Sequence, residues 1–269
     1  MKDHAPRKRF GQHFLTDTTL VDRMVRAIAP TDDQIVVEIG PGQGALTLPL
    51  LDRLNHLQVV ELDRDLISRL ERTIAAPRMT IHAADALKFD FRSLAKDGKK
   101  IRVVGNLPYN ISTPLMFHLL DQADCIEDMH FMLQKEVVDR LTATPGTSDW
   151  GRLSVMVQYY CQNDYLFFVP PEAFSPPPRV DSAVVRLTPL AEPAVKATDF
   201  GIFRQLVNQA FTQRRKVISN ALKSWLTAEQ IVAAGVDPGK RPDAIGLTEF
   251  VNLANSATVI YGSKQENDA

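Results

Sequence analysis

The sequence predicts an α/β protein, in which an open, Rossmann-like sheet is followed by a smaller, all-helical domain. Short apolar runs, such as those at residues 35–39 and 101–104, alternate with helical patterns, as in a parallel sheet with crossover helices. A glycine-rich turn directly follows the first of these runs. An Ala- and Pro-rich stretch later precedes a purely helical pattern. We therefore expect a sheet domain over residues 1–188, a linker over 189–198 and a helical domain over 199–269.

The composition is that of an ordinary soluble globular protein. The chain has 269 residues, of which 45% are hydrophobic and 23% charged, and its formal net charge is −1. Any binding to nucleic acid must therefore depend on local basic patches. No apolar run is long enough to span a membrane, and no apolar signal core follows the basic N-terminus. Cys125 and Cys161 lie in apolar surroundings and the histidines are scattered, so we expect a reduced, cytoplasmic protein without a metal site.

The N-terminal arm, residues 8–15, mixes basic, aromatic and polar side chains ahead of any regular pattern. Its interleaved Phe10 and Phe14 indicate that it packs, although a disordered basic tail is the alternative. If the arm packs, His13 and Leu15 could close over a ligand. The cations near its start could touch a phosphate backbone: Arg7, Lys8 and Arg9.

A nucleotide-binding turn is expected after the strand at residues 35–39. Glycines at this point let backbone N–H groups approach a ligand closely. The spacing fits two cofactors. Gly40, Gly42 and Ala45 match the dinucleotide pattern, and Gly40, Gly42 and Gly44 match an adenosylmethionine loop equally well. The turn alone leaves both cofactors open.

The next two strands each deliver a carboxylate to the same edge of the sheet. Glu61, near the end of residues 57–62, could accept hydrogen bonds from both ribose hydroxyls of either cofactor. Asp85 follows the strand at residues 79–83 and could accept a hydrogen bond from the adenine amine of the cofactor. A helix cap explains Asp85 equally well.

The most specific pattern runs from Asn106 to Tyr109, directly after the strand at residues 101–104. The amide oxygen of Asn106 and the free carbonyl of Pro108 can accept hydrogen bonds from an exocyclic amine, and the ring of Tyr109 offers a stacking face. This set would hold an extruded adenine with its amino group presented outward. Because Asn and Pro also favour turns, a simple turn is the alternative.

The remaining elements are predicted from periodicity. We expect helices over residues 17–29, 46–54, 134–142 and 152–161, and strands over residues 125–133, 165–169 and 180–187. The last two strands flank a proline-rich loop with little conformational freedom. Phe174 on this loop could stack on a target base opposite Tyr109, or it could plug the edge of the core.

Cations gather in the helical tail. The cluster comprises Arg214, Arg215, Lys216 and the nearby Lys223. A charge run of this kind is usually a solvated helix face, but contact with phosphates becomes the better interpretation if the sheet domain modifies RNA.

At these motifs the sequence resembles, over nearly its whole length, the bacterial family of small-subunit (16S) ribosomal RNA adenine dimethyltransferases. The matching segments are residues 8–12, 38–42, 61–63, 106–112, 132–137, 151–155 and 174–178. One departure is His13, where many members have Asn. Since both side chains can form hydrogen bonds, only the detailed role of this residue is affected.

The resemblance implies an S-adenosylmethionine-dependent methyltransferase that acts in ribosome biogenesis as a cytoplasmic monomer. It implies methyl transfer to the N6 amines of two adjacent adenines near the 3′ end of 16S rRNA, within the small ribosomal subunit. The catalytic residues would be Asn106, Leu107, Pro108, Tyr109 and Phe174. The cofactor-binding residues would be His13, Leu15, Gly40, Gly42, Glu61, Leu62, Asp85, Ala86 and Asn106.

Three other functions are compatible with parts of the pattern. A DNA adenine methyltransferase would use the same chemistry on duplex DNA. A non-catalytic ribosome assembly factor would keep the fold for binding only. An NAD dehydrogenase would account for the glycine turn, but it has no use for an amine-binding Asn-Leu-Pro-Tyr segment.

Overall fold

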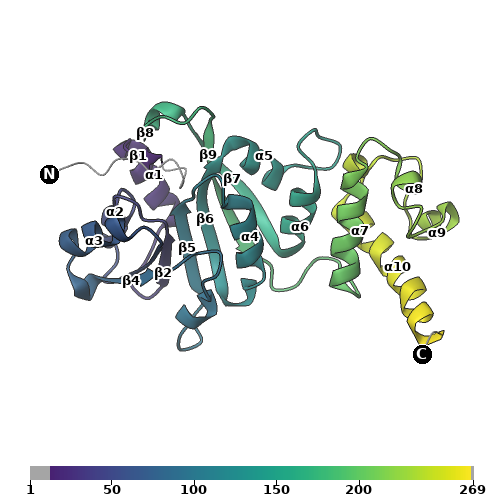
Figure 1. Ribbon diagram of the computed structural model, residues 1–269, viewed down its shortest axis with the longest axis horizontal. Coiled ribbons are helices and arrows are strands. Elements are labelled where there is room, and N and C mark those ends of the chain that lie inside the picture. The colour runs from purple at the N-terminus through teal and green to yellow at the C-terminus, as the bar shows by residue number, and fades with distance from the viewer. Residues whose placement is uncertain (1–12, 268–269) are drawn as a thin grey trace. The chain divides into compact units, whose positions relative to one another are not determined.

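The computed structural model describes residues 13–267, with side chains up to residue 260. Three cations expected to touch RNA lie outside the described residues: Arg7, Lys8 and Arg9. Within the described part, the chain forms an α/β unit and a helical unit. Figure 1 shows the helices and strands of both units.

The α/β unit comprises the chain up to Val138 together with Gln162–Pro189. Its helices are α1 (Thr18–Ile28), α2 (Thr47–Leu51), α3 (Arg64–Thr73) and α4 (Ser112–Leu120), and α5 (Lys135–Thr142) begins where this unit ends. Its strands are β1 (Phe14–Leu15), β2 (Ile35–Ile39), β3 (Leu57–Glu61), β4 (Met79–Ala83), β5 (Ile101–Asn106), β6 (Ile126–Gln134), β7 (Cys161–Val169), β8 (Phe174–Ser175) and β9 (Ser182–Pro189).

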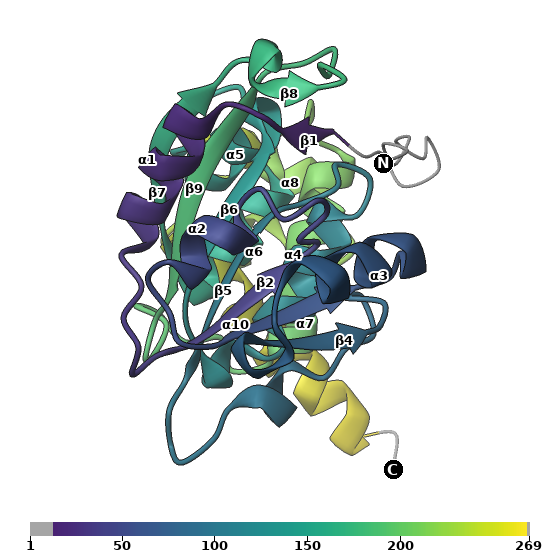
Figure 2. The ribbon, with the colours of Figure 1, turned by 90° about the vertical axis from the view of Figure 1, so that its left-hand side faces the viewer.

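Seven strands form one mixed sheet in the order β4-β3-β2-β5-β6-β9-β7. Strand β2 pairs in parallel with both β3 and β5, whereas β9 runs antiparallel to β6. The strand order therefore reverses at β2. In an open α/β sheet, a ligand crevice lies at such a point, outside the carboxyl ends of the strands. A separate ladder pairs β1 with β8 and places Phe14 and Leu15 beside the chain that follows β7 (Figure 2).

The core of the α/β unit forms where the strands pack against amphipathic helices. Val36 of β2 and Val104 of β5 belong to the same buried cluster as Met24 of α1 and Leu50 of α2. Helix α1 is capped by Asp17, whose side chain accepts hydrogen bonds from two backbone N–H groups. Its buried residues are Val21, Met24, Val25 and Ile28. This burial confirms the helix predicted at residues 17–29.

The helical unit comprises Asp139–Cys161 together with the chain from Leu190 onward. Its helices are α6 (Arg152–Tyr160), α7 (Phe200–Thr212), α8 (Ile218–Ala221), α9 (Ala228–Ala233) and α10 (Leu247–Asn267). Helices α7 and α10 lie side by side (Figure 1). Aromatic rings join α6 to α7, since the ring centroids of Tyr159 and Phe203 are 4.9 Å apart.

The two units differ from the predicted domains in one segment. A boundary at residue 188 assigns residues 139–161 to the sheet domain, whereas these residues are part of the helical unit. The indole N–H of Trp150 donates to the carbonyl of Ile245 at 2.9 Å and ties the segment to this unit. The predicted linker, residues 189–198, is also hydrogen-bonded to α6 and α10.

Two predicted elements differ most in length from those of the structure. Helix α2 covers Thr47–Leu51 rather than residues 46–54, because the chain turns from Asp52 onward. Strand β7 begins at Cys161 rather than at residue 165. It lies at the edge of the sheet, where polar residues are tolerated on both faces and obscure the two-residue period.

Candidate active site

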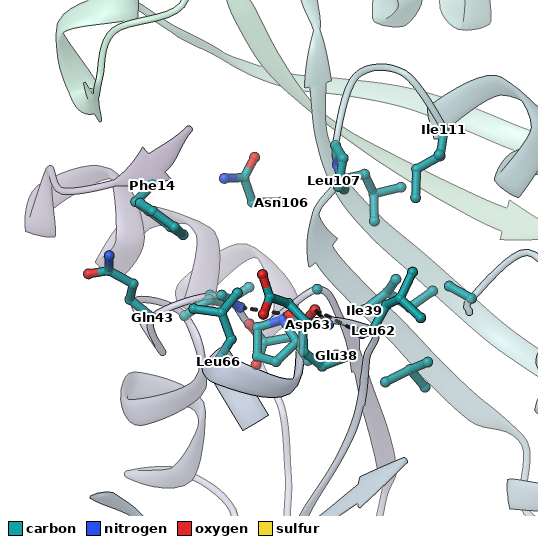
Figure 3. A pocket seen from close by; sticks show the side chains of 18 of the residues that line it. Phe14, Glu38, Ile39, Gln43, Leu62, Asp63, Leu66, Asn106, Leu107 and Ile111 are labelled. Atoms are coloured by element: carbon teal, nitrogen blue, oxygen red, sulfur yellow. Dashed lines mark hydrogen bonds between the residues drawn. The ribbon is translucent and has the colours of Figure 1, made fainter. Parts of the chain in front are cut away.

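A pocket opens at the carboxyl ends of β2, β3, β4 and β5, where the reversal of strand order predicts a ligand crevice (Figure 3). Its volume is about 260 Å³. All the residues expected to bind the cofactor line it: His13, Leu15, Gly40, Gly42, Glu61, Leu62, Asp85, Ala86 and Asn106. Of the residues expected to be catalytic, those lining it are Asn106, Leu107, Pro108 and Tyr109.

The turn after β2 has a backbone that favours glycine. Gly40 and Gly42 have φ values of +67° and +59°, in the left-handed region. The first heavy atom that a Cβ on Gly40 would meet is Cδ of Pro108, at 4.0 Å. A side chain at Gly40 would therefore enter the space between the glycine turn and the Asn-Leu-Pro-Tyr segment. Gly105 is constrained more severely, since its Cβ would lie 2.5 Å from the carbonyl oxygen of Ile39.

Glu61 ends β3 with its carboxylate held by backbone N–H groups. Its Oε1 accepts hydrogen bonds from the N–H groups of Leu62 and Asp63 at 2.8 and 2.9 Å, and its Oε2 accepts one from Gly42 at 3.4 Å. Burial raises the pKa of Glu61, although these three hydrogen bonds act in the opposite direction. The carboxylate is thus fixed against the glycine turn and faces the pocket.

Asp85 lies after β4 and faces the pocket, but it does not cap a helix. Its Oδ1 accepts a hydrogen bond from the N–H of Leu87 at 3.0 Å, and this bond stabilises a turn rather than a helix. The same residue lines the pocket. The local bond orients the carboxylate without removing it from the site.

Glu38 lines the pocket, although no role for it was predicted from the sequence. It precedes the glycine turn on β2 and is 1% exposed, and its Oε2 accepts a hydrogen bond from the hydroxyl of Thr47 at 2.7 Å. Burial raises its pKa to about 8, against the effect of the Thr47 bond and with a further contribution from nearby Glu61. Glu38 is therefore mostly protonated at neutral pH. In the sequence, a role for Glu38 is indicated by its position in the motif of residues 38–42.

Asn106 projects from the end of β5 toward the N-terminal arm (Figure 3). Its Nδ2 donates a hydrogen bond to the main-chain carbonyl of His13 at 3.3 Å. This bond orients the amide so that the nitrogen is bound to the arm and the oxygen is turned away from it. An acceptor for an incoming amine is thereby set in place, as the motif predicts.

The carbonyl of Pro108 differs from the prediction. It was expected to be free, but it accepts a hydrogen bond from the N–H of Ile111 at 3.1 Å, because the chain turns into α4 at this point. A carbonyl oxygen has two lone pairs and can accept a second hydrogen bond. Pro108 can therefore still receive an amine hydrogen, but as a shared acceptor.

Tyr109 is half-buried and fixed at both its ring and its hydroxyl. The hydroxyl lies 2.6 Å from the hydroxyl of Ser182, at the start of β9. The ring stacks on that of His13, with centroids 5.8 Å apart and planes inclined by 26°. Burial raises the pKa of Tyr109, so its hydroxyl stays protonated under ordinary conditions.

Phe174 does not take the position expected for a second base-stacking ring. It is 3% exposed, belongs to the hydrophobic core, and is not among the residues lining the pocket. It pairs with Leu15 across the β1–β8 ladder, which turns it inward. Of the two interpretations considered, the structure supports the one in which Phe174 plugs the edge of the core.

The sequence matches a family model described as ribosomal RNA adenine dimethylase over residues 3–258. The chain belongs to this dimethylase family. Among its relatives is the ribosomal RNA small subunit methyltransferase A of Alcanivorax borkumensis, which is 66% identical over 95% of this chain and 91% of that protein. The protein of the same name from Pseudomonas aeruginosa is 56% identical over 97% of this chain and 98% of its own length.

Solved structures agree with this assignment. The crystal structure of the 23S rRNA methyltransferase ErmE superposes with a TM-score of 0.71 and 27% identity, covering 90% of this chain and 98% of that chain. A dimethyladenosine transferase from Plasmodium falciparum shows the same fold, with a TM-score of 0.78, 24% identity and coverage of 94% and 98%. The predicted Rossmann-like methyltransferase fold is confirmed.

Family membership confirms the expected enzyme class and cofactor. The dimethylase is an S-adenosylmethionine-dependent transferase, which removes the dinucleotide alternative for the glycine turn. The pocket suits this cofactor chemically, because the side-chain-free Gly40 leaves space beside Pro108, and the Glu61 carboxylate offers acceptors for hydroxyl groups.

In the helical unit of the dimethylase, Arg214, Arg215 and Lys216 lie in the turn between α7 and α8, and Lys223 lies in the turn after α8, so the cluster is not on a helix face. Arg214 forms an ion pair with Asp243 at 3.6 Å and donates a hydrogen bond to the carbonyl of Ser148. The exposed members of the cluster are Arg215, Lys216 and Lys223. Part of the cluster therefore stabilises the unit itself, and part is directed to solvent.

The described part of the dimethylase shows neither a metal-binding cluster nor a membrane-spanning helix. Over the described residues, no group of three or more His, Cys, Asp and Glu side chains could hold a metal ion. In the same part of the chain, none of the helices combines the length and apolar character needed to cross a membrane.

Proposed function

We propose that this dimethylase modifies the N6 amines of two adjacent adenines near the 3′ end of 16S rRNA, within the small ribosomal subunit. The relatives named small subunit methyltransferase A support this substrate. Within the structure, the supporting observation is the orientation of Asn106. Because its nitrogen is bound to the carbonyl of His13, its oxygen is available as an acceptor for the substrate amine.

The cofactor roles follow from the arrangement of the pocket. When bound, S-adenosylmethionine would supply an electrophilic methyl group: the adenine amine would attack the methyl carbon in line, the carbon–sulfur bond would break, and the sulfur would leave as the neutral thioether of S-adenosylhomocysteine. Glu61 would accept hydrogen bonds from the ribose hydroxyls, and Asp85 would accept one from the cofactor's adenine amine. Leu62, although apolar, is 53% exposed and offers a surface on which the cofactor's base can lie. The remaining contacts come from His13, Leu15, Gly40, Gly42 and Ala86.

Asn106, Pro108 and Tyr109 prepare the target adenine for reaction. The exocyclic amine is a weak nucleophile, because its lone pair is drawn into the ring. Hydrogen bonds from the amine to the Asn106 oxygen and the Pro108 carbonyl favour a more tetrahedral, nucleophilic nitrogen. Tyr109 holds the base by stacking, which uses its ring rather than its hydroxyl. Leu107, which is 1% exposed, lies between the two acceptors in the chain and lines the pocket with them.

No general base is required by this arrangement. The methylated amine carries a positive charge and is acidic enough to lose its proton to solvent. The chain then accelerates the reaction by positioning the target amine and by electrostatic stabilisation of the charge that develops on it. After the first transfer one N–H remains, and the unshared oxygen of Asn106 can accept it while a second methyl group is added.

RNA outside the active site would be bound through its phosphates. Arg215, Lys216 and Lys223 are exposed and directed to solvent, as phosphate-binding cations require. Arg214 contributes less, because it is already paired with Asp243. From the sequence alone we add a second group of contacts, at Arg7, Lys8 and Arg9.

We further propose that the enzyme works as a monomer in the cytoplasm. Cys125 and Cys161 are buried free thiols, as is usual in a reducing compartment. Burial raises the pKa of Cys161 to about 12, so this thiol is unreactive at physiological pH.

The test uses small-subunit particles from cells that lack this activity. The particles are incubated with the protein and methyl-labelled S-adenosylmethionine, the RNA is digested, and the labelled nucleoside is identified. We expect N6,N6-dimethyladenosine at two adjacent positions near the 3′ end. Naked 16S rRNA and duplex DNA serve as alternative substrates.

Each of the other possible results would contradict part of the proposed function. Label in duplex DNA but not in ribosomal RNA would favour a DNA adenine methyltransferase. Monomethyladenosine alone would leave the chemistry intact but contradict dimethylation. Binding of particles and cofactor without any label would indicate an assembly factor instead of an enzyme.

A further inference from the structure

Gln134 lies at the carboxyl edge of the sheet but has no role in the reaction described so far. It is the last residue of β6 and belongs to the motif of residues 132–137. Strand β6 lies between β9 and β5, which leads into the Asn-Leu-Pro-Tyr segment (Figure 1). The position of Gln134 is therefore fixed by a strand on each side.

The side chain of Tyr109 lies across the end of β6. The chain that follows β5 stays against β6, because the N–H of Leu107 donates to the carbonyl of Met132 at 3.2 Å. The hydroxyl of Tyr109 then lies 2.6 Å from that of Ser182, which is on β9. Neighbouring strands are about 4.8 Å apart, so the Tyr109 ring spans the width of β6 to reach Ser182. It does so at the end of the strand, where Gln134 is located.

The register of the sheet places Gln134 on the same face as the residues that hold the target adenine. Gln134 is directly opposite Ser182 in the antiparallel β6–β9 pair. Such residues have their Cβ atoms about 4.5–5.5 Å apart and on one face. Because the Ser182 hydroxyl is bonded to Tyr109, this is the face that Tyr109 occupies. Met132, two residues before Gln134 and on the same face, is paired with Asn106 of β5.

The amide of Gln134 is available for a ligand. The residue is half-buried, and in the described part of the chain its side-chain amide forms no hydrogen bond. Its neighbours at this edge are bound within the chain, since the amide nitrogen of Asn106 donates to His13 and the hydroxyl of Tyr109 is bonded to Ser182. An amide that a ligand shields from water needs a hydrogen-bond partner on that ligand.

Adenine offers such a partner beside its amine. In the proposed function the amine hydrogens are directed to Asn106 and Pro108. The two ring nitrogens that flank the amine, N1 and N7, are unprotonated acceptors and remain unused. An amide N–H is a neutral donor, so it can bind one of them without protonating the ring. Protonation of the ring would draw the lone pair further from the amine and slow the reaction.

We propose that the side-chain amide of Gln134 donates a hydrogen bond to one of these two ring nitrogens and so fixes the orientation of the target adenine. This inference rests on the proposed function and adds a base-recognition residue to its site. A flipped base is commonly read through hydrogen bonds to its edge as well as by stacking. Tyr109 would then hold the face of the base, and Asn106, Pro108 and Gln134 would hold its edge.

The experiment compares Gln134→Met with the unsubstituted protein in the full chain. Methionine keeps the length of the side chain, and hence its packing beside Tyr109, but has no N–H donor. The substrates are reconstituted small-subunit particles that carry adenine, 1-deazaadenine or 7-deazaadenine at one target position. Each analogue replaces one flanking nitrogen by C–H. The values of kcat and KM are measured with each substrate, the Kd of S-adenosylmethionine is measured by calorimetry, and circular dichroism establishes that the variant is folded.

We expect Gln134→Met to lose roughly tenfold in kcat/KM with natural adenine, while the Kd of the cofactor stays within about twofold. With one analogue the two proteins should differ by less than about twofold, because the hydrogen bond is then absent from both. That analogue identifies the nitrogen that is bound. With the other analogue the difference of roughly tenfold should persist. Any effect of an analogue on the amine itself is common to both proteins and cancels in this comparison.

Two outcomes would overturn the inference while leaving the proposed function intact. Equal activity of both proteins on natural particles would show that the amide is not used. A difference that persists with all three substrates would make Gln134 a support for the Tyr109 ring instead of a contact of the base. If Gln134→Met does not fold, Gln134→Glu replaces it, since it keeps the shape and has no N–H donor when ionised. Failure of the unsubstituted protein to methylate natural particles is a different result, because it would refute the proposed function itself.

Discussion

At the carboxyl edge of the sheet, Glu38 and Glu61 are buried against N–H and hydroxyl groups, whereas toward the amino edge the partly buried Asp128 pairs with a buried cation. Arg102 donates two hydrogen bonds to Asp128, at 2.8 and 2.7 Å. His130 lies 3.6 Å from the same carboxylate. Burial alone would raise the pKa of Asp128, but its neighbours His130 and Arg102 lower it to about 2.

The ion pair at the amino edge stabilises the fold, whereas the carboxylates at the carboxyl edge line the ligand pocket. At the amino edge the charges satisfy one another, and Arg102 is further bound to the side-chain oxygen of Gln34 at 2.9 Å. At the carboxyl edge the pKa values of Glu38 and Glu61 are raised, because burial is not offset by a cation among the described residues. Perturbed carboxylates in a pocket are typical of ligand-binding sites. We therefore expect changes at the two edges to affect different properties.

The largest effect is expected for Asn106→Ala at the carboxyl edge. It removes the oriented acceptor for the substrate amine, and methylation of particles should fall at least about 10³-fold, equivalent to roughly 4 kcal/mol. The free energy of unfolding should change by less than about 1 kcal/mol, since one hydrogen bond to the carbonyl of His13 is lost. Label incorporation and urea denaturation measure the two quantities.

The cofactor affinity of Asn106→Ala provides the control. It should stay within a few-fold of the unsubstituted value, because most cofactor contacts come from other residues of the pocket. Near-normal turnover, or loss of activity that merely follows loss of cofactor binding, would contradict the assignment of Asn106 as the amine acceptor.

The opposite pattern is expected for Arg102→Leu at the amino edge. Removing the guanidinium leaves the partly buried carboxylate of Asp128 without its ion-pair partner, and the free energy of unfolding should fall by about 3 kcal/mol, the lower end of the range for a buried pair. Activity per folded molecule should be unchanged at low temperature. The double variant Arg102→Met, Asp128→Leu should recover most of the stability, because no charge is then left uncompensated. Loss of activity without loss of stability would show that the amino edge serves the reaction.

A smaller effect concerns the dependence of stability on pH. Glu38 is protonated in both the folded and the unfolded state at low pH, and the unfolded state ionises first, near pH 4.5. The free energy of unfolding should therefore fall between about pH 4.5 and 8, by a few kcal/mol in total. Asp128 acts with the opposite sign, since its stabilisation is lost only below pH 3.8.

The variant Glu38→Gln tests this difference between the edges. Its amide is neutral at every pH, so the fall in stability between pH 5.5 and 8 should be clearly smaller than in the unsubstituted protein. Urea denaturation at both pH values measures the change. Part of the fall should persist, because the pKa of Glu61 is also raised. An identical fall in both proteins would mean that Glu38 is ionised in the folded state.

The carboxyl edge could be predicted largely from the sequence, because its residues follow strands within local motifs. Gly40, Glu61, Asp85 and Asn106 each come at or directly after the end of a strand, and parallel strands bring such positions together. The structure adds what depends on distant partners. The shared carbonyl of Pro108 and the burial of Glu38 depend on how the chain packs around these motifs.

Contacts between segments that are far apart in the sequence could not be predicted from local patterns. Arg102 and Asp128 are 26 residues apart; Arg102 is one polar residue within an apolar strand, and Asp128 is one of several polar residues at the start of another. The family resemblance, together with the rigid loop, placed Phe174 at the base site, yet the β1–β8 ladder turns it into the core. Residues 152–161 could be predicted as a helix from their periodicity. Their place in the helical unit could not, because it depends on long-range contacts such as that of Trp150.

The smallest expected effect tests whether every bond at the carboxyl edge is functional. Tyr109→Phe removes the hydroxyl that bonds to Ser182 but keeps the stacking ring. We expect a loss of about 1 kcal/mol in the free energy of unfolding and a change of less than about threefold in kcat/KM. Tyr109→Ala is the matched control and should lose at least roughly tenfold in kcat/KM, since stacking on a base is removed. If Tyr109→Phe were as inactive as Tyr109→Ala, the hydroxyl would take part in the reaction, and the Ser182 bond would belong to the catalytic machinery rather than to the support of the ring.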